Sequence, residues 1–150
     1  DSWPMQRLAL LPDVLCASET FLDVHGMPRD PSDLDPKYCI GMLDAQGEVR
    51  SWSFVKDSRE LSVAPSSPIV FSDSQSAVAA AVRGAGFARV PALAVEAHIA
   101  AGLLRPVLSD WMPANQAVWL KYAPPMTAEL DAFADFVAGL LPTSANAEAN

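Results

Sequence analysis

The sequence predicts a mixed α/β fold, and three observations support this. Short apolar runs with β-branched residues alternate with segments of helical period, and Pro and Gly mark most boundaries between them. The chain has 150 residues, of which 51% are hydrophobic and 19% charged, so it can bury a sizeable core. No apolar run approaches the roughly 20 residues that a membrane-spanning helix needs.

The first part of the chain is predicted to contain a buried strand, a short helix and a loop. Residues 14–17 (VLCA) form an apolar run that is typical of a buried strand. Ser18 then caps a helix that ends at Gly26, and a stretch dense in Pro and Asp predicts a loop. After the loop, 38–43 and 49–55 predict an antiparallel hairpin, and two shorter strands follow.

From Ser72 onward the helical period dominates. Residues 72–84 predict a helix with one apolar stripe, and 86–90 predict a strand. Pro91 opens a second helix, which Gly102 closes. The inward face of this second helix is expected to consist of Leu93, Ala97 and Ala100.

Two strands and a helix complete the pattern. Residues 103–108 and 117–123 predict strands, and Thr127 is expected to cap the last helix. Apolar residues recur in that helix every three or four positions, at Leu130, Phe133, Val137 and Leu140. The polar tail 142–150 is expected to be disordered.

The composition argues against nucleic-acid binding by this stretch of chain. Its 18 acidic and 10 basic residues give a formal net charge of −8, and the basic residues are scattered. Nucleic-acid binding draws most of its affinity from clustered Lys and Arg. The two cysteines, Cys16 and Cys39, make neither a metal-ligand pattern nor a disulfide framework, so we expect two buried thiols in a reducing cytoplasm.

Several motifs, each weak alone, together resemble the effector-binding domain of LysR-type transcriptional regulators. RLA at 7–9 followed by VLCAS resembles the first crossover of that family. SETFLDVHGMPRDPSDLDPKYCIGM resembles its helix, Gly-x-Pro, Asp-Leu and strand. SDSQSAVAAAVRGAGFARVP resembles the helix and return crossover, and AAGLLRPVLSDW the Gly-x-Leu-x-x-Val-Leu-x-x-Trp segment. The sequence departs from the family pattern at Ser18-Glu19, where Ser-Pro is usual, and at 123–126 (APPM).

The resemblance implies a type 2 periplasmic-binding-protein-like α/β fold, with a ligand cleft between two subdomains. It assigns 1–11 to a remnant of the first subdomain and the crossover, 12–88 to a nearly complete second subdomain, and 89–141 to the return segment of the first. It also implies a winged helix-turn-helix and opening elements that this chain lacks. We therefore expect contact with DNA only through such a domain, and pairing of exposed sheet edges in a homo-oligomer.

The polar start of the helix at 72–76 (SDSQS) is the best candidate for ligand contact. Unpaired N–H groups and the helix dipole at a helix amino terminus favour an anion. The side chains of Ser74, Gln75 and Ser76 add hydrogen-bond donors. The resemblance implies a small organic acid as the effector, which agrees with such a site. The alternative is that the residues before Ser74 only cap the helix.

A second candidate region is the strand end at Ile40, Gly41 and Met42, which the resemblance places along the cleft. Gly41 would permit a close backbone approach, and Met42 would form an adaptable apolar wall. The alternative is that Ile40 and Met42 belong to the core. Ser18, at the start of another helix, is a weaker candidate for effector binding.

Motifs for catalysis and for metal binding are missing from the sequence. It has no nucleophile elbow, no phosphate-cradling Gly-rich loop and no paired carboxylates on one helix face. His25 and His98 lack a second ligand at metal-binding spacing, so we expect no metal, no cofactor and no catalytic residue.

We interpret the chain as the effector-sensing regulatory domain of a bacterial LysR-type regulator, which binds a small metabolite and modulates transcription allosterically. Two other classes stay open. The chain could be a free-standing small-molecule binding protein without DNA-binding activity, or an α/β hydrolase-like enzyme whose site is assembled from distant residues.

Overall fold

The computed structural model describes residues 4–113, 116–123 and 125–140, which fall into two units. The larger unit is Asp13–Pro113, and the smaller one combines Asp1–Pro12 with Ala114–Asn150. The sequence had instead placed the return to the first subdomain at residue 89. The segment up to Pro113 stays with the larger unit because its strands pair with the strand that opens this unit.

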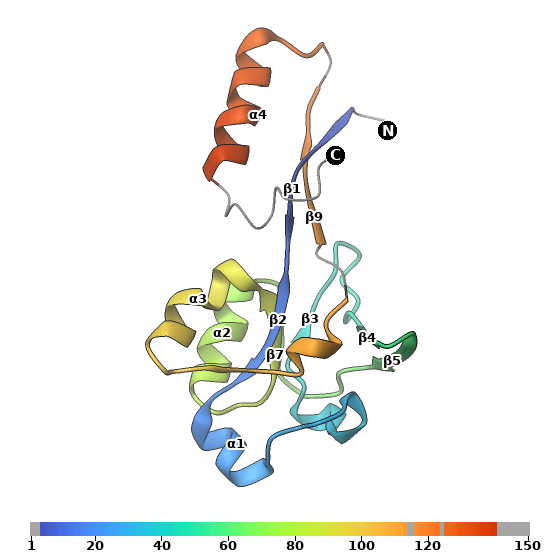
Figure 1. Ribbon diagram of the computed structural model, residues 1–150, viewed down its shortest axis with the longest axis vertical. Coiled ribbons are helices and arrows are strands. Elements are labelled where there is room, and N and C mark those ends of the chain that lie inside the picture. Colours follow the sequence, from blue (N-terminus) through green and yellow to red (C-terminus); the bar gives the residue numbers. More distant parts are fainter. Residues whose placement is uncertain (1–3, 114–115, 124, 141–150) are drawn as a thin grey trace. The chain divides into compact units, whose positions relative to one another are not determined.

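That opening strand, β2 (Asp13–Ala17), is the centre of a three-stranded antiparallel sheet (Figure 1). Its neighbours are β7 (Ala88–Pro91) and β8 (Arg105–Val107). Successive residues of a strand point to opposite faces, and here both faces are buried. Leu15 enters one apolar cluster and Cys16 the other, and neither has exposed surface. The prediction of a buried strand at 14–17 is confirmed.

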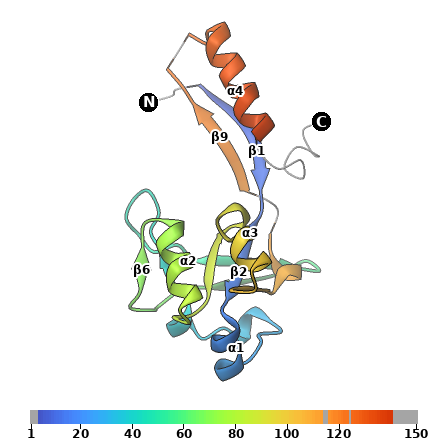
Figure 2. The ribbon, with the colours of Figure 1, turned by 90° about the vertical axis from the view of Figure 1, so that its left-hand side faces the viewer.

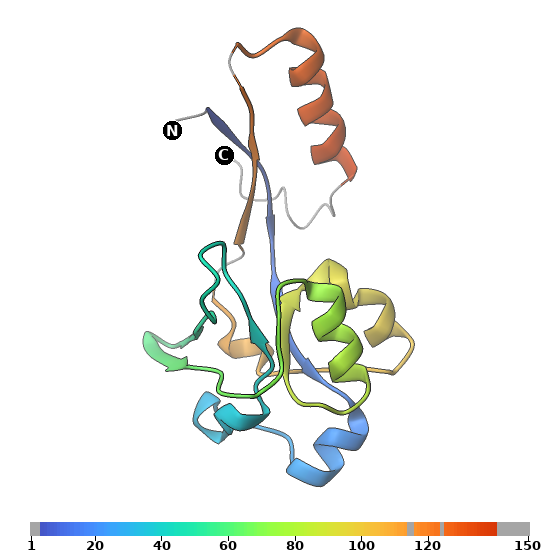
Figure 3. The same ribbon diagram turned by 180° about the vertical axis from the view of Figure 1, so that it is seen from behind.

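The face of the sheet that carries Cys16 is covered by α2 (Ser74–Val82) and α3 (Ala92–Ala100), which Figure 3 shows side by side. The inward face of α2 agrees with the predicted stripe, since Ala77, Val78 and Ala81 are buried. For α3 the predicted face is wrong. Leu93 is 46% exposed and Ala97 and Ala100 are exposed, whereas Val95 is fully buried. The sequence ALAVEAHIA is apolar almost all round, so its periodicity does not select a face.

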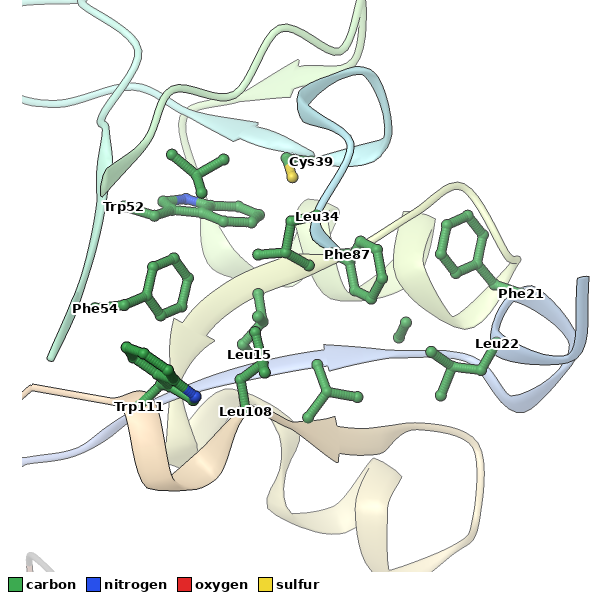
Figure 4. Close-up of a cluster of buried hydrophobic side chains, with 13 residues drawn as sticks. Leu15, Phe21, Leu22, Leu34, Cys39, Trp52, Phe54, Phe87, Leu108 and Trp111 are labelled. Atoms are coloured by element: carbon green, nitrogen blue, oxygen red, sulfur yellow. The ribbon is translucent and has the colours of Figure 1, made fainter. Parts of the chain in front are cut away.

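The face of the sheet that carries Leu15 is covered by α1 (Glu19–His25) and by the hairpin of β4 (Trp52–Lys56) and β5 (Arg59–Val63). Figure 4 shows this aromatic-rich cluster. Its labelled members are Leu15, Phe21, Leu22, Leu34, Cys39, Trp52, Phe54, Phe87, Leu108 and Trp111. Trp52 and Phe54 lie on one buried face of β4, as their alternation predicts.

The helix α1 has the boundaries that its end residues predict. The Ser18 Oγ accepts a hydrogen bond from the Phe21 N–H at 3.2 Å, and Gly26 follows the last residue with φ +88°. The loop after it contains two 3-10 turns, η1 (Pro31–Asp33) and η2 (Pro36–Tyr38).

The predicted hairpin between 38–43 and 49–55 is wrong for the main pairing of each segment. Tyr38 lies in η2, and only β3 (Gly41–Met42) is a strand, which pairs in parallel with β6 (Val70–Phe71). The expected pairing forms only at its turn end. There Leu43 bridges Val49, the Asp44 N–H donates to the Glu48 carbonyl and the Arg50 N–H donates to the Met42 carbonyl. The hairpin forms instead between β4 and β5, across the tight turn at 57–58.

The smaller unit consists of β1 (Met5–Leu11), β9 (Gln116–Lys121) and α4 (Ala128–Leu140) (Figure 2). The two strands are antiparallel, and α4 contacts β1. Thr127 caps α4 as predicted, accepting from the Leu130 N–H at 3.2 Å. Of the predicted apolar stripe, Leu130 and Val137 are half-buried beside the buried Ala134. Phe133 and Leu140, the other two members, are exposed. The predicted disordered tail 142–150 lies outside the described residues.

The backbone at Gly86 approaches the chain after η2 very closely. The Phe87 N–H donates to the Tyr38 carbonyl at 2.8 Å, and the Ile40 N–H donates to the Phe87 carbonyl at 2.8 Å. Gly86 has φ +150°, and a Cβ on it would stand 2.1 Å from the Tyr38 carbonyl oxygen. Only glycine fits at this position.

We expect Gly86→Ala to lower the free energy of unfolding by about 3 kcal/mol or more, because the strained φ and the backbone clash add together. Gly47→Ala is the matched control, since Gly47 also has positive φ (+81°) but no atom within 4 Å of the added Cβ. It should cost about 1 kcal/mol. Urea unfolding of both variants measures the difference, and equal losses would contradict the close approach at Gly86.

Candidate effector site

Two parallel strands end beside the start of α2, and this is where most of the predicted site residues meet. Gly41 pairs with Val70 and Met42 with Phe71. The Leu43 N–H donates to the Phe71 carbonyl at 2.9 Å, and Asp73, two residues after Phe71, is the N-cap of α2. In α/β proteins the carboxyl ends of parallel strands are a preferred place for ligands.

The start of α2 combines donors with a negative charge. The Asp73 Oδ1 accepts from the Ser76 N–H at 2.8 Å, so the capping role is confirmed and this amide is occupied. The hydrogen bond from Ser76 holds the pKa of Asp73 below its usual range, so its carboxylate is ionised at neutral pH. The Ser76 side chain also hydrogen-bonds to that carboxylate. Ser74 is half-buried and Gln75 is exposed.

At the end of β3, only one side chain of the predicted three is partly open. Ile40 is fully buried in the cluster beneath α2. A Cβ on Gly41 would lie 3.0 Å from a methyl group of Val70 and 3.2 Å from one of Val49, so valine side chains already fill that space. Met42 is half-buried and packs against the same cluster as Ile40.

Ser18 does not join the other candidates. It is 4% exposed, and its hydroxyl lies 3.2 Å from the Thr20 hydroxyl as well as capping α1. The same hydroxyl is 3.6 Å from where a Cβ on Gly84 would stand. Gly84 follows the carboxyl end of α2, whereas Ser74 begins that helix, so Ser18 lies at the opposite end of α2.

Arg50 is a residue near the site that the sequence prediction missed. Its N–H donates to the Met42 carbonyl at 2.9 Å, and its residue surface is exposed. Its positive charge favours the ionised form of two nearby carboxyls, those of Asp44 and Asp13. Hydrogen bonds from backbone N–H groups, chiefly that of Glu48, lower the pKa of Asp44, and Arg50 adds to that effect. The hairpin predicted between 38–43 and 49–55 already placed Arg50 opposite this strand end. A single basic residue outside any motif gave no signal of a role in the site.

A second arginine, Arg89 of β7, lies largely buried beside the first residue of β2. The Arg89 Nε is 3.6 Å from the Asp13 Oδ2, and its side chain is 8% exposed. Burial raises the pKa of the Asp13 carboxyl, while Arg89 and then Arg50 oppose that rise. Burial also lowers the pKa of Arg89, with Asp13 opposing.

The two cysteines are free and buried, as the sequence predicts. Burial raises the pKa of Cys16 to about 12. Burial, with a smaller contribution from Asp35, raises the pKa of Cys39 to about 12. The thiolate is the reactive form, so neither group is activated at neutral pH. Within the described residues no three His, Cys, Asp or Glu side chains are grouped to hold a metal ion.

The chain matches a known family over nearly its whole length. The model of the LysR substrate binding domain covers residues 2–142. A Pseudomonas aeruginosa protein whose name describes a transcriptional regulator is 32% identical over 120 residues, which are 79% of this chain and 38% of that protein. A Klebsiella pneumoniae protein, named as an HTH-type transcriptional regulator LtrA, is 25% identical over 134 residues, covering 86% of this chain and 43% of that protein. The chain thus spans less than half the length of these relatives.

Solved structures share the fold. The full-length Vibrio cholerae virulence activator AphB superposes with a TM-score of 0.77 and 20% identity, over 93% of this chain and 48% of that one. The regulatory domain of CrgA, a LysR-type regulator from Neisseria meningitidis, superposes with a TM-score of 0.67 and 21% identity, over 93% of this chain and 69% of that one. These similarities confirm the expected type 2 periplasmic-binding-protein-like architecture. Among the described residues no helix has the length and apolarity to cross a membrane.

We expect both thiols to resist iodoacetamide at pH 8 in the folded protein, because less than about one part in a thousand would be thiolate. Both should react once urea unfolds the chain. Mass spectrometry before and after unfolding counts the modified cysteines. Rapid labelling of either cysteine in the folded state would show that its burial is not maintained in solution.

Proposed function

The chain belongs to the LysR substrate binding domain family, and from this premise we propose that it is the effector-sensing part of a bacterial LysR-type transcriptional regulator. The observation that carries the proposal is the family match over residues 2–142. The named relatives support it, since both are described as transcriptional regulators. The whole protein would work as a regulator in the cytoplasm, and not as an enzyme.

The effector site proposed here comprises Ser18, Ile40, Gly41, Met42, Ser74, Gln75 and Ser76. The arrangement of β3, β6 and α2 supports a division of roles among them. Ser74, Gln75 and Ser76 would donate hydrogen bonds, and Met42 would supply the apolar wall. The buried Ile40 and the crowded Gly41 would act by setting the position of Met42. Ser18, at the other end of α2, would act only by anchoring α1 near that end.

A small carboxylate is the proposed class of effector, and the local charges decide how it would bind. The ionised Asp73 repels an anion at the start of α2, so the helix dipole alone is insufficient. Arg50, held beside Met42, would supply the compensating positive charge and can pair with both oxygens of a carboxylate. The effector would therefore place its carboxylate toward Arg50 and its polar groups toward Ser74 and Gln75.

Regulation follows from differential binding. An effector can shift an equilibrium between two states of the protein only by the difference in its affinity for them, typically about 1–3 kcal/mol of coupling. We propose that this coupling changes how a homo-oligomer presents separate DNA-binding domains. The stretch described here would not contact DNA itself, because its net charge of −8 opposes the approach of phosphates.

A free-standing binding protein is the alternative function, and it would use the same effector site. The coding sequence upstream of this chain distinguishes the two functions. A helix-turn-helix segment in the same reading frame supports the regulator, and a start codon directly before the chain favours the binding protein.

We expect at least one small mono- or dicarboxylic acid from a broad panel to raise the melting temperature by several degrees at millimolar concentration. A ligand at about 100 times its Kd adds about 2.7 kcal/mol of stability, which corresponds to such a shift. Arg50→Gln should weaken binding about 10-fold or more, because it removes a hydrogen bond to a charged group. Gln75→Ala should weaken it by about 3- to 10-fold, because it removes a hydrogen bond to a neutral polar group. Thermal shift followed by titration calorimetry measures both effects.

Ser62→Ala is the matched control for this experiment, since Ser62 is an exposed residue of β5 outside the proposed site. It should bind the same acid as the wild type does. An acid that binds the Gln75 and Arg50 variants as tightly as it binds the wild type would rule out the proposed site. A panel without any stabilising acid would argue against a carboxylate effector.

A further inference from the structure

The β4–β5 hairpin reaches both ends of the larger unit. This unit starts at Asp13 and ends at Pro113, and its ends are far apart in the sequence. Each end is held by charged or aromatic contacts that lead to the same five-residue strand, β4 (Trp52–Lys56), or to the turn that follows it. The family match does not account for this convergence.

At the start of the unit, Arg89 links Asp13 to β4. Its Nε lies 3.6 Å from the Asp13 Oδ2, and its Nη1 donates to the Ser53 carbonyl at 2.7 Å. The guanidinium also stands over the Phe54 ring, 5.4 Å from the centroid. Arg89 is largely buried, so these contacts replace the water that its charge has lost. Movement of β4 would therefore disturb the partner of Asp13.

At the end of the unit, two cations beside the hairpin turn hold Trp111. Lys56 and Arg59 face each other across the turn, and their charged groups lie 5.7 Å and 5.6 Å from the centroid of the indole. Lys56 also bonds to Asp110, the neighbour of Trp111. Trp111 is only 5% exposed and stands two residues before Pro113.

The two anchors share one packed cluster. Phe54, under Arg89, and Trp111, under Lys56 and Arg59, belong to the same group of buried side chains, and Figure 4 shows them close together. Phe54 is 1% exposed, so β4 cannot shift at one anchor without displacing side chains at the other.

We propose that the β4–β5 hairpin is a conformational coupling element, which makes the start of the larger unit at Asp13 and its end at Trp111 respond to each other. Coupling requires an element that both positions bias, and the hairpin is that element. The hairpin also begins beside the candidate effector site, because the Arg50 N–H donates to the Met42 carbonyl at 2.9 Å. A further effect, in which effector binding is transmitted along β4, rests on the proposed function. The coupling between the two ends of the larger unit does not depend on it.

Hydrogen exchange of single amides in the purified chain tests the coupling without any effector. The double variant Lys56→Gln/Arg59→Gln removes both cations from Trp111 and leaves the Asp13 pair intact. We expect the Trp111 N–H, bonded to the Leu108 carbonyl at 2.9 Å, to exchange about 2–10-fold faster. The Val14 amide, next to Asp13, should accelerate by a comparable factor although no residue near it is changed.

The control is Lys37→Gln/Arg83→Gln, which removes the same charge from two exposed cations on η2 and after α2. It should leave both amides unchanged. The Ala101 N–H, bonded to the Ala97 carbonyl at 3.0 Å at the end of α3, is a reference amide outside the hairpin, and its exchange should also stay unchanged in the hairpin variant.

The reverse experiment uses Asp13→Asn, which weakens the start of the unit. Reciprocity of coupling requires that Asp13→Asn then accelerate exchange of the Trp111 amide, relative to the wild type, by a larger factor than that of the Ala101 amide. Acceleration at Trp111 alone in the hairpin variant, or equal acceleration at all amides including Ala101, would overturn the proposal. So would unchanged exchange at both ends.

Discussion

Burial of β2 on both faces is the constraint from which the larger unit follows. The strand pairs with β7 from Asp13 to Cys16 and with β8 from Leu15 to Ala17, and its side chains point into an apolar layer on each face. Leu15 and Cys16 enter different clusters, and a shift of register by one residue would exchange them. Everything that covers the sheet is therefore positioned by these few residues.

The register of β2 also explains where the charges lie. Arg89 is opposite Leu15 in the pairing of β7 with β2, so its side chain points to the same face as Leu15, where the β4–β5 hairpin packs. Its neighbours Ala88 and Val90 enter the other cluster. A charged residue between two buried apolar ones is tolerated because Asp13, Ser53 and Phe54 surround it. The contacts that hold the start of the unit thus follow from strand alternation.

The candidate effector site joins features that oppose each other. The carboxyl ends of β3 and β6 and the start of α2 form a typical place for a ligand, yet the Asp73 cap brings a negative charge to it. Arg50 lies beside this site, because its N–H donates to the Met42 carbonyl, and in the proposed function it supplies the positive charge that an anionic effector requires. The two cysteines of the larger unit are buried with raised pKa values, so their thiols are not activated at neutral pH.

The sequence alone determined the fold class, the family resemblance and the ends of most helices. Ser18, Gly26 and Thr127 act within four residues of themselves, so their effect can be predicted locally. The tertiary structure decided which face of α3 is buried, since the alanine-rich segment offers several apolar faces and only its neighbours select Val95. It also decided that β3 pairs with β6 and that Arg89 reaches Asp13 and Ser53. Those contacts join segments far apart in the chain, and local patterns of polarity carry no information about which distant segment will lie alongside.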